Sequence, residues 1–304
     1  MKVNFIGHRK INLFMSLSLF VVAVVALLIF GLKPGNDFTG GSSLEIKFTK
    51  DAPATEQIKE ILVPLNFGNI SAQTAGDGGV ILKMRFINET EHQQMLTKLR
   101  ENFEKGDLKV LEERFETVGP AISTQLRTRS LYAVVAVLLA IIAYIAYSFR
   151  RVSKPVASWK YGTVAVIAIL HDVTITAGVF AFLGHYLGVE VDVPFVVALL
   201  TILGYSVNDT IVVFDRIREN IIRRSCDNFA DTVNQAINET FARSINTTAT
   251  TLFTLFAMFF FGGDTIKWFV MALLVGIFLG AYSSIFVASP LLVEWNNWQN
   301  RKRT

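Results

Sequence analysis

The sequence predicts an α-helical membrane protein with six transmembrane helices and a small α+β domain outside the membrane, between the first helix and the second. Composition is the first reason: of the 304 residues, 52% are hydrophobic and 18% are charged, and the mean hydropathy is +0.43. That balance is too apolar for an ordinary soluble protein. Six apolar runs are long enough to cross the hydrocarbon core as helices. The segment between the first two runs instead has the polarity of a soluble domain.

The six runs set the predicted domain boundaries. Residues 1–32 form an N-terminal tail and the first helix, 33–129 the exterior domain with its joints, and 130–304 a five-helix membrane domain. The first apolar run, 13–32, is longer than the core of a secretory signal and no small-x-small cleavage site follows it, so we expect a retained anchor. The helices are predicted near 12–32, 130–149, 161–184, 193–214, 244–262 and 267–292.

Lysine and arginine in the short loops predict the orientation of the chain. Fourteen of them fall on one side of the membrane, whereas the opposite short loops, 185–192 and 262–267, hold only Lys267. Because positive residues gather in cytoplasmic loops, both termini are predicted to be cytoplasmic and the exterior domain periplasmic. The fourteen residues are Lys2, Arg9, Lys10, Arg150, Arg151, Lys154, Lys160, Arg216, Arg218, Arg223, Arg224, Arg301, Lys302 and Arg303.

The exterior segment predicts the element order β-α-β-β-α-β. Apolar residues alternate in the predicted strands and recur at helical spacing in the predicted helices. This order is that of a ferredoxin-like split βαβ unit, a fold that hosts many functions. The predicted strands are 43–48, 70–74, 80–87 and 109–118, the helices are 55–65 and 90–103, and a glycine-rich turn lies at 76–79.

Two joints connect the exterior domain to the membrane helices. One contains Gly40 and Gly41 in the segment 37–41 (DFTGG), and the other contains Gly119 and Pro120 in the segment 118–121 (VGPA). Glycine permits unusual backbone angles and proline restricts them. The joints are either ordinary linkers, which composition favours, or two hinges that let the exterior domain move.

Asp209 is the most unusual residue of the membrane domain, because it is a carboxylate inside the apolar run 193–214. An ionisable side chain at bilayer depth costs a few kcal/mol or more and usually marks an ion or proton path, with its partner nearby. Arg243, near the start of the next helix, lies at a similar depth and is the predicted partner. Because arginine stays protonated, we expect Asp209 to take up and release protons and Arg243 to control that exchange by moving. The alternative is a static ion pair that joins two helices.

Polar side chains extend from both residues along one face of each helix. Thr201, Tyr205 and Asp209 follow one another at steps of four, with Asn208 beside them, and this spacing places them on one helix face. Because polar stripes are costly against lipid, we expect both stripes to face the bundle interior or a hydrated cavity and to line the proton path. The stripe that follows Arg243 consists of Thr247, Thr250, Thr251 and Thr254.

The third predicted helix adds Asp172 close to mid-membrane, with His171 before it and Thr176 one turn beyond. Asp172 is either a further member of the proton pathway or a packing residue. His171 is typical of a hydrogen-bonded interior histidine. No second His, Cys or Glu stands at a metal-ligand spacing, so no metal site is predicted.

Two further patterns concern packing rather than chemistry. Gly276 and Gly280 belong to a small-residue face of the last helix, which allows close contact between helices. Between the fourth and fifth helices, the apolar residues of 229–240 predict an amphipathic helix on the cytoplasmic surface, either a docking surface or a connector.

Several classes of protein are excluded by missing motifs. The sequence has no G-x-x-x-x-G-K-[ST] phosphate loop, no G-x-S-x-G and no H-E-x-x-H. We therefore predict that the chain is not an enzyme and uses no cofactor, with protons as the coupling ion. No concentrated basic surface indicates a nucleic-acid partner, and the single cysteine, Cys226, excludes a disulfide framework.

Five segments of the chain together resemble the SecF branch of the SecD/SecF family. The resemblance covers essentially the whole chain, and the segment around Asp209 is its strongest part. One departure is Asn36, where relatives commonly have an aliphatic residue. The segments are 37–41 (DFTGG), 118–120 (VGP), 171–173 (HDV), 204–219 (GYSVNDTIVVFDRIRE) and 242–248 (ARSINTT).

The resemblance implies a six-helix member of the resistance–nodulation–division superfamily in the bacterial inner membrane. Its implied partners are SecD, the SecYEG channel with the SecA ATPase, the translocating preprotein and the lipid bilayer. The family is held to use the proton-motive force in late steps of protein export, and its proton-path aspartate and arginine fall on Asp209 and Arg243.

Two alternative functions are weighed against this one. The first is a proton-coupled small-molecule exporter of the same superfamily, although such proteins usually have larger exterior domains and twelve helices. The second is an intramembrane aspartyl protease that uses Asp172 and Asp209, which requires the two carboxyl groups to lie about 3 Å apart.

Overall fold

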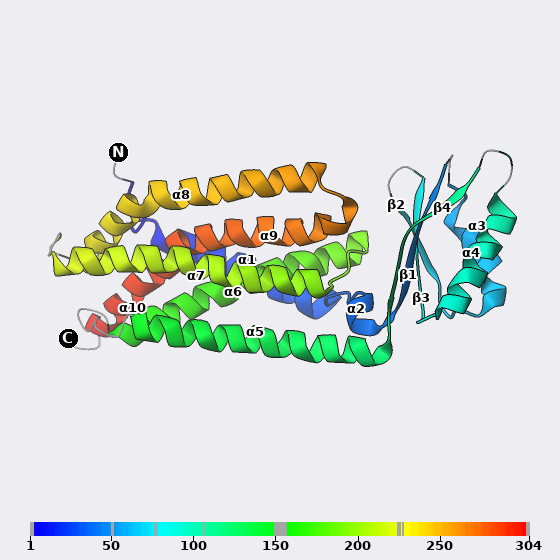
Figure 1. Ribbon diagram of the computed structural model, residues 1–304. Coiled ribbons are helices and arrows are strands. Elements are labelled where there is room, and N and C mark those ends of the chain that lie inside the picture. Colours follow the sequence, from blue (N-terminus) through cyan, green and yellow to red (C-terminus); the bar gives the residue numbers. More distant parts are fainter. Residues whose placement is uncertain are drawn as a thin grey trace. The chain divides into compact units, whose positions relative to one another are not determined.

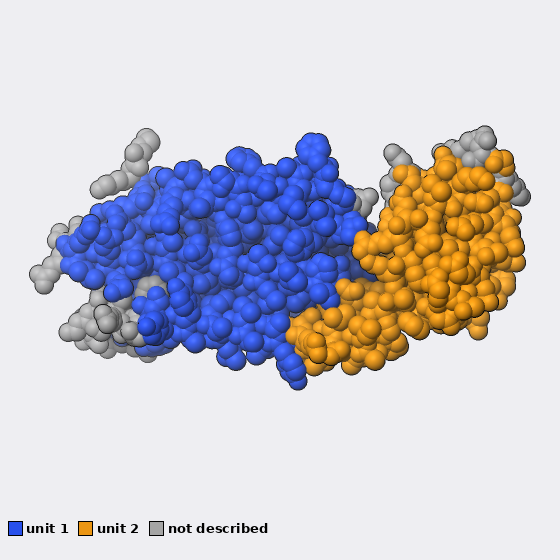
Figure 2. All heavy atoms as spheres, viewed as in Figure 1, with its two compact units in different colours: residues 1–33, 132–304 blue, residues 34–131 orange. Residues whose placement is uncertain are grey.

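The computed structural model describes residues 3–49, 52–75, 78–104, 106, 108–148, 157–223, 226 and 228–301. The chain divides into two compact units, which we call the membrane unit (1–33 with 132–304) and the head (34–131) (Figure 2). Part of the predicted turn at 76–79 lies outside the described residues. So do seven of the fourteen positive residues used for orientation, namely Lys2, Arg150, Arg151, Lys154, Arg224, Lys302 and Arg303.

The membrane unit is built of long helices that lie alongside one another (Figure 1). Across the described residues, six helical segments are long and apolar enough to cross a membrane, and the sixth runs from Thr265 to Arg301. The predicted six-helix fold is confirmed. The helices are α1 (Arg9–Phe30), α5 (Pro120–Ser148), α6 (Ser158–Leu187), α7 (Val193–Ile222), α8 (Phe229–Phe261), α9 (Asp264–Ser283) and α10 (Ser289–Arg301), and a π-helical turn, η2 (Ser284–Ala288), joins the last two.

The core of the membrane unit lies among α6, α7, the N-terminal part of α8 and the run from α9 to α10. Ala168 of α6, Phe214 of α7 and Ile285 of η2 belong to one buried apolar cluster. The start of α7 is fixed locally, because Asp192 Oδ1 accepts a hydrogen bond from the backbone N–H of Phe195, 2.9 Å away. Such a cap satisfies a donor that the first turn would otherwise leave unpaired.

Glycines mark the closest crossings between these helices. A Cβ atom on Gly276 of α9 would lie 2.2 Å from Ile202 Cδ1 of α7, and one on Gly280 would lie 3.0 Å from Ser206 Cβ. A crossing that the sequence did not reveal joins α1 to α6 at Gly178, where an added Cβ would lie 2.6 Å from that of Ala23. Small residues thus let α6, α7 and α9 approach their neighbours closely.

The fifth helix differs from its prediction. A separate amphipathic helix was expected over 229–240 and a span over 244–262, but α8 is one continuous helix from Phe229 to Phe261. No proline or glycine interrupts this segment, so nothing in it stops helix propagation. Val233 and Ile237 are fully buried in the core cluster, which makes the N-terminal part of α8 a packed element rather than a free surface.

The head contains one four-stranded sheet with α3 and α4 against one face (Figure 1). The strand order is β2-β3-β1-β4, and all neighbours are antiparallel, as in a ferredoxin-like unit. The predicted α+β head is confirmed. Its elements are α2 (Asn36–Thr39), β1 (Gly41–Phe48), α3 (Thr55–Leu62), a 3-10 turn η1 (Val63–Leu65), β2 (Ser71–Ala75), β3 (Gly79–Met84), α4 (Glu89–Phe103) and β4 (Val110–Val118).

A reciprocal cap fixes the start of α4. The Asn88 side chain accepts a hydrogen bond from the Glu91 backbone at 2.9 Å, and the Glu91 side chain accepts one from the Asn88 backbone at 3.0 Å. Arg85 Nη2 also donates to Glu91 Oε1 at 2.6 Å. The hydrogen bond from Arg85 and the one from the Asn88 backbone hold the pKa of Glu91 below its ordinary value of 4.5.

Glu91→Gln is expected to make the stability of α4 less sensitive to acid. Because the pKa of Glu91 is lowered in the folded state, its stabilising contribution is present above the ordinary value and is lost as the pH falls through the folded pKa. Hydrogen-exchange protection of α4, corrected for the intrinsic pH dependence, should therefore fall on acidification in the parent chain and less in the variant. Glu101→Gln, at the other end of α4, is the matched control, and equal acid sensitivity in both variants would contradict the prediction.

Candidate functional site

Asp209 lies on α7 in the seam with α8, with only 7% of its surface exposed. Its Oδ1 atom accepts a hydrogen bond from Ser244 Oγ of α8 at 2.8 Å. The other carboxyl oxygen, Oδ2, is buried and has no hydrogen-bond partner among the described residues. A buried oxygen of this kind is costly to leave unpaired. The site is therefore a carboxyl group that accepts a hydrogen bond from one hydroxyl on Oδ1 and can accept a proton or a further hydrogen bond on Oδ2.

Arg243 does not form the ion pair that was predicted from the sequence. No ion pair between Arg243 and Asp209 is found within the described residues, and the Arg243 side chain is exposed. The reason is helix phase: consecutive residues of a helix point about 100° apart. Ser244 therefore faces Asp209 while Arg243 faces away from the core. The hydrogen bond between Ser244 and Asp209 nevertheless places Arg243 at the same level along the helices.

The polar stripes also face differently from the prediction. They were expected to face the bundle interior, but on α7 the side chains of Thr201 and Asn208 are exposed and Tyr205 is half-buried. Apolar residues elsewhere on α7, such as Ile202 and Val213, occupy the core instead. On α8, Thr247, Thr250 and Thr254 are exposed and Thr251 is half-buried.

The hydroxyl groups of this polar face are hydrogen-bonded within their own helices. Thr247 donates to the carbonyl of Arg243, Thr250 to that of Asn246 and Thr251 to that of Thr247, at 2.5, 3.0 and 3.0 Å. Thr201 of α7 likewise donates to the carbonyl of Val197 at 2.8 Å. The face is therefore polar without being joined to any other described helix through these hydroxyls.

Asp172 lies at the centre of the membrane unit and is fully buried. Its Oδ2 atom accepts hydrogen bonds from Ser206 Oγ of α7 and from Ser283 Oγ of α9, each at 2.7 Å. Its Oδ1 atom lies 3.0 Å from Nδ1 of the neighbouring His171. Asp172 thus connects three helices through side-chain hydrogen bonds.

The two membrane carboxyl groups belong to separate networks. Asp209 is bonded to Ser244, whereas Asp172 is bonded to Ser206 and Ser283, and the two share no hydrogen-bond partner in the described part of the chain. An aspartyl-protease dyad needs two carboxyl groups that share one proton. This arrangement therefore gives the protease alternative no support.

Sequence reasoning missed three serines that contact these carboxylates, namely Ser206, Ser244 and Ser283. Ser206 stands three residues before Asp209 and Ser244 directly follows Arg243, so their places in the sequence were a usable signal. Serine is common in membrane helices and bonds readily to its own backbone. Only the packing distinguishes these three from the other hydroxyl residues.

The two joints of the head are adjacent rather than independent. Gly41 begins β1 and is paired with Val118, the last residue of β4. Gly40 and Gly41 have φ angles of 75° and 139°, a region that favours glycine. Pro120 is the first residue of α5, a position that suits proline because its missing N–H is not needed there. The hinge function of these residues stays a prediction.

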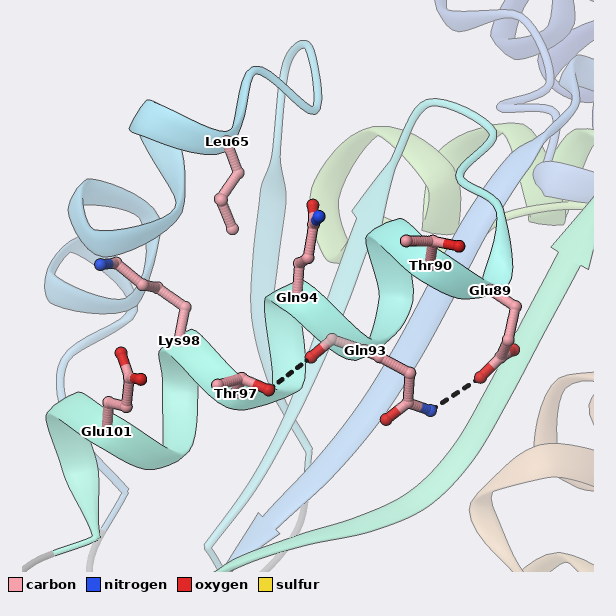
Figure 3. Close-up of a pocket in the computed structure, with 8 residues that line it drawn as sticks. All are labelled: Leu65, Glu89, Thr90, Gln93, Gln94, Thr97, Lys98 and Glu101. Atoms are coloured by element: carbon pink, nitrogen blue, oxygen red, sulfur yellow. Dashed lines mark hydrogen bonds between the residues drawn. The ribbon is translucent and has the colours of Figure 1, made fainter.

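The head also has a shallow groove of about 590 Å³ along α4 (Figure 3). Its side chains come from α4 and from Leu65 of η1, and within it Gln93 donates to Glu89 at 2.7 Å. Among the described residues, no group of three or more His, Cys, Asp or Glu side chains is arranged to hold a metal ion. The groove is lined by Leu65, Glu89, Thr90, Gln93, Gln94, Thr97, Lys98 and Glu101.

Comparison with known proteins places this chain in a family. Residues 97–298 match the family described as protein export membrane protein SecD/SecF, C-terminal, and residues 25–52 match the SecD/SecF GG motif. Protein translocase subunit SecF of Thermobaculum terrenum is 42% identical over 97% of this chain and 94% of its own length. The SecF subunit of Anaerolinea thermophila is 37% identical over 98% of this chain and 97% of its own.

Solved structures of fused SecDF proteins share the fold. The crystal structure of SecDF from Thermus thermophilus, a translocon-associated membrane protein, has a TM-score of 0.82 and 32% identity, covering 98% of this chain and 39% of that one. SecDF in its super-membrane-facing form has a TM-score of 0.70 and 33% identity, covering 100% and 40%. The chain therefore spans about two fifths of the fused proteins.

Together with these matches, the six apolar helices found in the described residues and the ferredoxin-like head identify a polytopic subunit of a protein translocase. The chain belongs to the SecD/SecF family of protein-export membrane proteins, and it matches subunits named SecF over nearly their whole length.

Proposed function

We propose that this chain couples proton movement through the membrane to late steps of protein export, as the partner of a SecD chain. The observation on which the proposal depends is the state of Asp209: a buried carboxyl group bonded on one oxygen to Ser244 and unpartnered, among the described residues, on the other. Such a group at bilayer depth is the expected acceptor of a mobile proton. Protons are then the coupling ion, and no other cofactor is required.

The uncovered polar face of α7 and α8 supports SecD as the partner. Exposed residues such as Asn208, Arg243 and Thr247 are costly to leave against lipid. About three fifths of each fused relative lies outside the part that matches this chain. The name of these relatives joins SecD to SecF. A SecD membrane domain that packs on this face would cover the polar side chains and enclose a hydrated path beside Asp209.

Arg243 then acts from the interface between the two subunits. Its side chain is exposed in this chain, at the level of the hydrogen bond between Ser244 and Asp209. A movement of the guanidinium toward Oδ2 of Asp209 favours the ionised carboxylate and releases the proton, and a movement away favours proton uptake. One proton that crosses 100 mV releases about 2.3 kcal/mol, enough to bias the head between two orientations.

We extend the proposal to the location of the chain and to its further partners, as the resemblance to the family implies. The chain lies in the bacterial inner membrane with both termini in the cytoplasm and the head in the periplasm, in agreement with the distribution of lysine and arginine in the loops. It works beside the SecYEG channel after the SecA ATPase, on the emerging preprotein.

Asp209→Asn tests the proposed function. In membrane vesicles that contain SecD and the channel, the variant should lose the part of preprotein export that a proton gradient stimulates, while export driven by ATP alone remains. Asn keeps the shape of the side chain and can still accept from Ser244, but it cannot take up a proton. Asp215→Asn is the matched control, because Asp215 is an exposed carboxylate on the same helix. Unchanged stimulation in Asp209→Asn would overturn the proposal.

A further inference from the structure

Asp172 joins three membrane helices by short hydrogen bonds between side chains. The carboxylate comes from α6, and its Oδ2 atom accepts from Ser206 of α7 and from Ser283 of α9, each at 2.7 Å. All three side chains are at most 1% exposed. Where no water competes, such bonds are stronger than at a surface. Removing the carboxylate would leave two buried hydroxyls without this acceptor.

Close packing keeps this junction in register. Gly280 of α9 lies against Ser206, so that a Cβ atom at Gly280 would be 3.0 Å from the Ser206 Cβ atom and 3.1 Å from its Cα atom. The backbones of α7 and α9 therefore approach closely one turn before Ser283. The serine hydroxyls can reach Asp172 only while α7 and α9 keep this approach.

A second hydrogen bond joins α7 to the π-helical turn that directly follows α9, and its α7 residue lies on the C-terminal side of Asp209. Thr210 Oγ1 of α7 lies 2.9 Å from Ser284 Oγ, and both residues are fully buried. Ser284 is the first residue of the π-helical turn η2, and π turns inside helices are frequent at functional sites. The neighbouring serines Ser283 and Ser284 thus contact Asp172 and Thr210 respectively.

These two links bracket Asp209 on α7. Ser206 precedes Asp209 by three residues, and Thr210 directly follows it. Both links hold α7 on its core side, whereas Asp209 reaches Ser244 of α8. The two links therefore constrain the depth and the rotation of α7, and with them the distance between Asp209 and Ser244.

We propose that Asp172 is a positioning residue for Asp209: through Ser206 and Ser283 it holds α7 so that the Asp209 carboxyl group faces Ser244. This inference rests on the proposed function and assigns Asp172 a role other than proton transfer. Asp172 is fully enclosed, and its described hydrogen-bond partners are His171, Thr176, Ser206 and Ser283, none of which is hydrogen-bonded to the Asp209 side chain. His171 is the titratable group that faces it from α6.

Three variants test this role in vesicles that contain the full chain with SecD and the channel. Asp172→Asn keeps an oxygen that can accept from one serine, and Ser206→Ala removes the link to α7 without touching either carboxylate. Ser283→Ala removes the link to α9. Thr176→Val is the matched control, because Thr176 is also buried on α6 but its hydroxyl donates to the backbone carbonyl of Asp172 rather than to the carboxylate.

Both the rate and the pH profile of gradient-stimulated export are to be measured, together with the amount of folded protein. Each of the three variants should lower the rate without abolishing it, by up to about 100-fold, since a misplacement of about 1 Å can have that effect. Each should also shift the pH of half-maximal stimulation, because the Asp209 carboxyl group meets a changed environment. Adding Ser206→Ala to Asp172→Asn should have a smaller effect than Ser206→Ala alone, since Asp172→Asn already weakens the link to Ser206.

Three results would overturn the inference. If Asp172→Asn abolishes stimulation as completely as Asp209→Asn while Ser206→Ala has no effect, Asp172 is a proton carrier. If the variants yield less folded protein, but the folded protein that remains shows the parent pH profile of stimulated export, the junction serves packing alone. If Asp209→Asn stops stimulation and all three variants behave like Thr176→Val, the positioning role fails while the proposed function stands.

Discussion

Replacing Arg243 with methionine is expected to abolish gradient-stimulated export while leaving the amount of folded protein unchanged. Arg243 is exposed and makes no ion pair within the described residues, so its removal leaves no buried partner unpaired in this chain. The loss should instead concern the charge that the side chain brings to the level of Asp209. Vesicle export with and without a proton gradient measures it.

Two further substitutions make this result specific. Arg243→Lys restores the charge without the planar fork and should recover part of the stimulation. Arg218→Met, which removes a half-buried arginine of α7 near Asp215, should leave stimulation close to that of the parent chain. Parent-like stimulation in Arg243→Met would remove Arg243 from the proton site and leave Asp209 with Ser244 alone.

Gly178→Val is expected to disrupt the crossing of α1 and α6. Even a Cβ atom at position 178 would lie 2.6 Å from Ala23 Cβ, 2.7 Å from Ala23 Cα and 2.9 Å from the Ala23 carbonyl oxygen. Two of these are backbone atoms that cannot rotate away, so α1 must shift. Overpacking typically costs about 1–3 kcal/mol of folding free energy, and valine adds two methyl groups beyond the Cβ atom. Thermal inactivation of the purified chain should begin at a lower temperature.

Gly204→Ala is the matched control for this substitution. Gly204 lies in the middle of α7, and a Cβ atom there would meet nothing within 4 Å. Alanine is the better helix former by about 0.5–1 kcal/mol, so the variant should be at least as stable as the parent. Because position 204 is on the face assigned to SecD, the comparison is made on the chain purified without SecD. Equal stability of Gly178→Val and Gly204→Ala would contradict the crossing.

The length of the apolar runs was sufficient to predict the membrane helices, and hydrophobic periodicity was sufficient to predict the elements of the head. The alternation of Leu44, Ile46 and Phe48 and the helical spacing of Met95, Leu96 and Leu99 gave the correct core of the head. The boundary inside α8 was wrong for a related reason. A change from amphipathic to apolar composition near Ser244 resembled a break, but continuous helix needs only the absence of a breaker.

The candidate site could be predicted only in part. Asp209 stood out because a carboxylate in an apolar run is anomalous, whichever neighbour it meets. Periodicity then placed Thr201 and Asn208 near its face but could not say which helices cover that face, and the structure leaves both exposed. Ser244 was missed because a single residue step, from Arg243 to Ser244, decides which side chain points at α7.

The threonine stripe of α8 has a further consequence for what can lie against it. Each hydroxyl proton of Thr247, Thr250, Thr251 and Thr254 is already directed at a carbonyl of its own helix. What the stripe presents outward is therefore oxygen lone pairs, with no hydrogen atoms to offer. A surface of that polarity accepts and does not donate. Such a surface can accept a hydrogen bond from a hydrated proton or from a donor on a partner, and these four hydroxyls offer no donor to an anion.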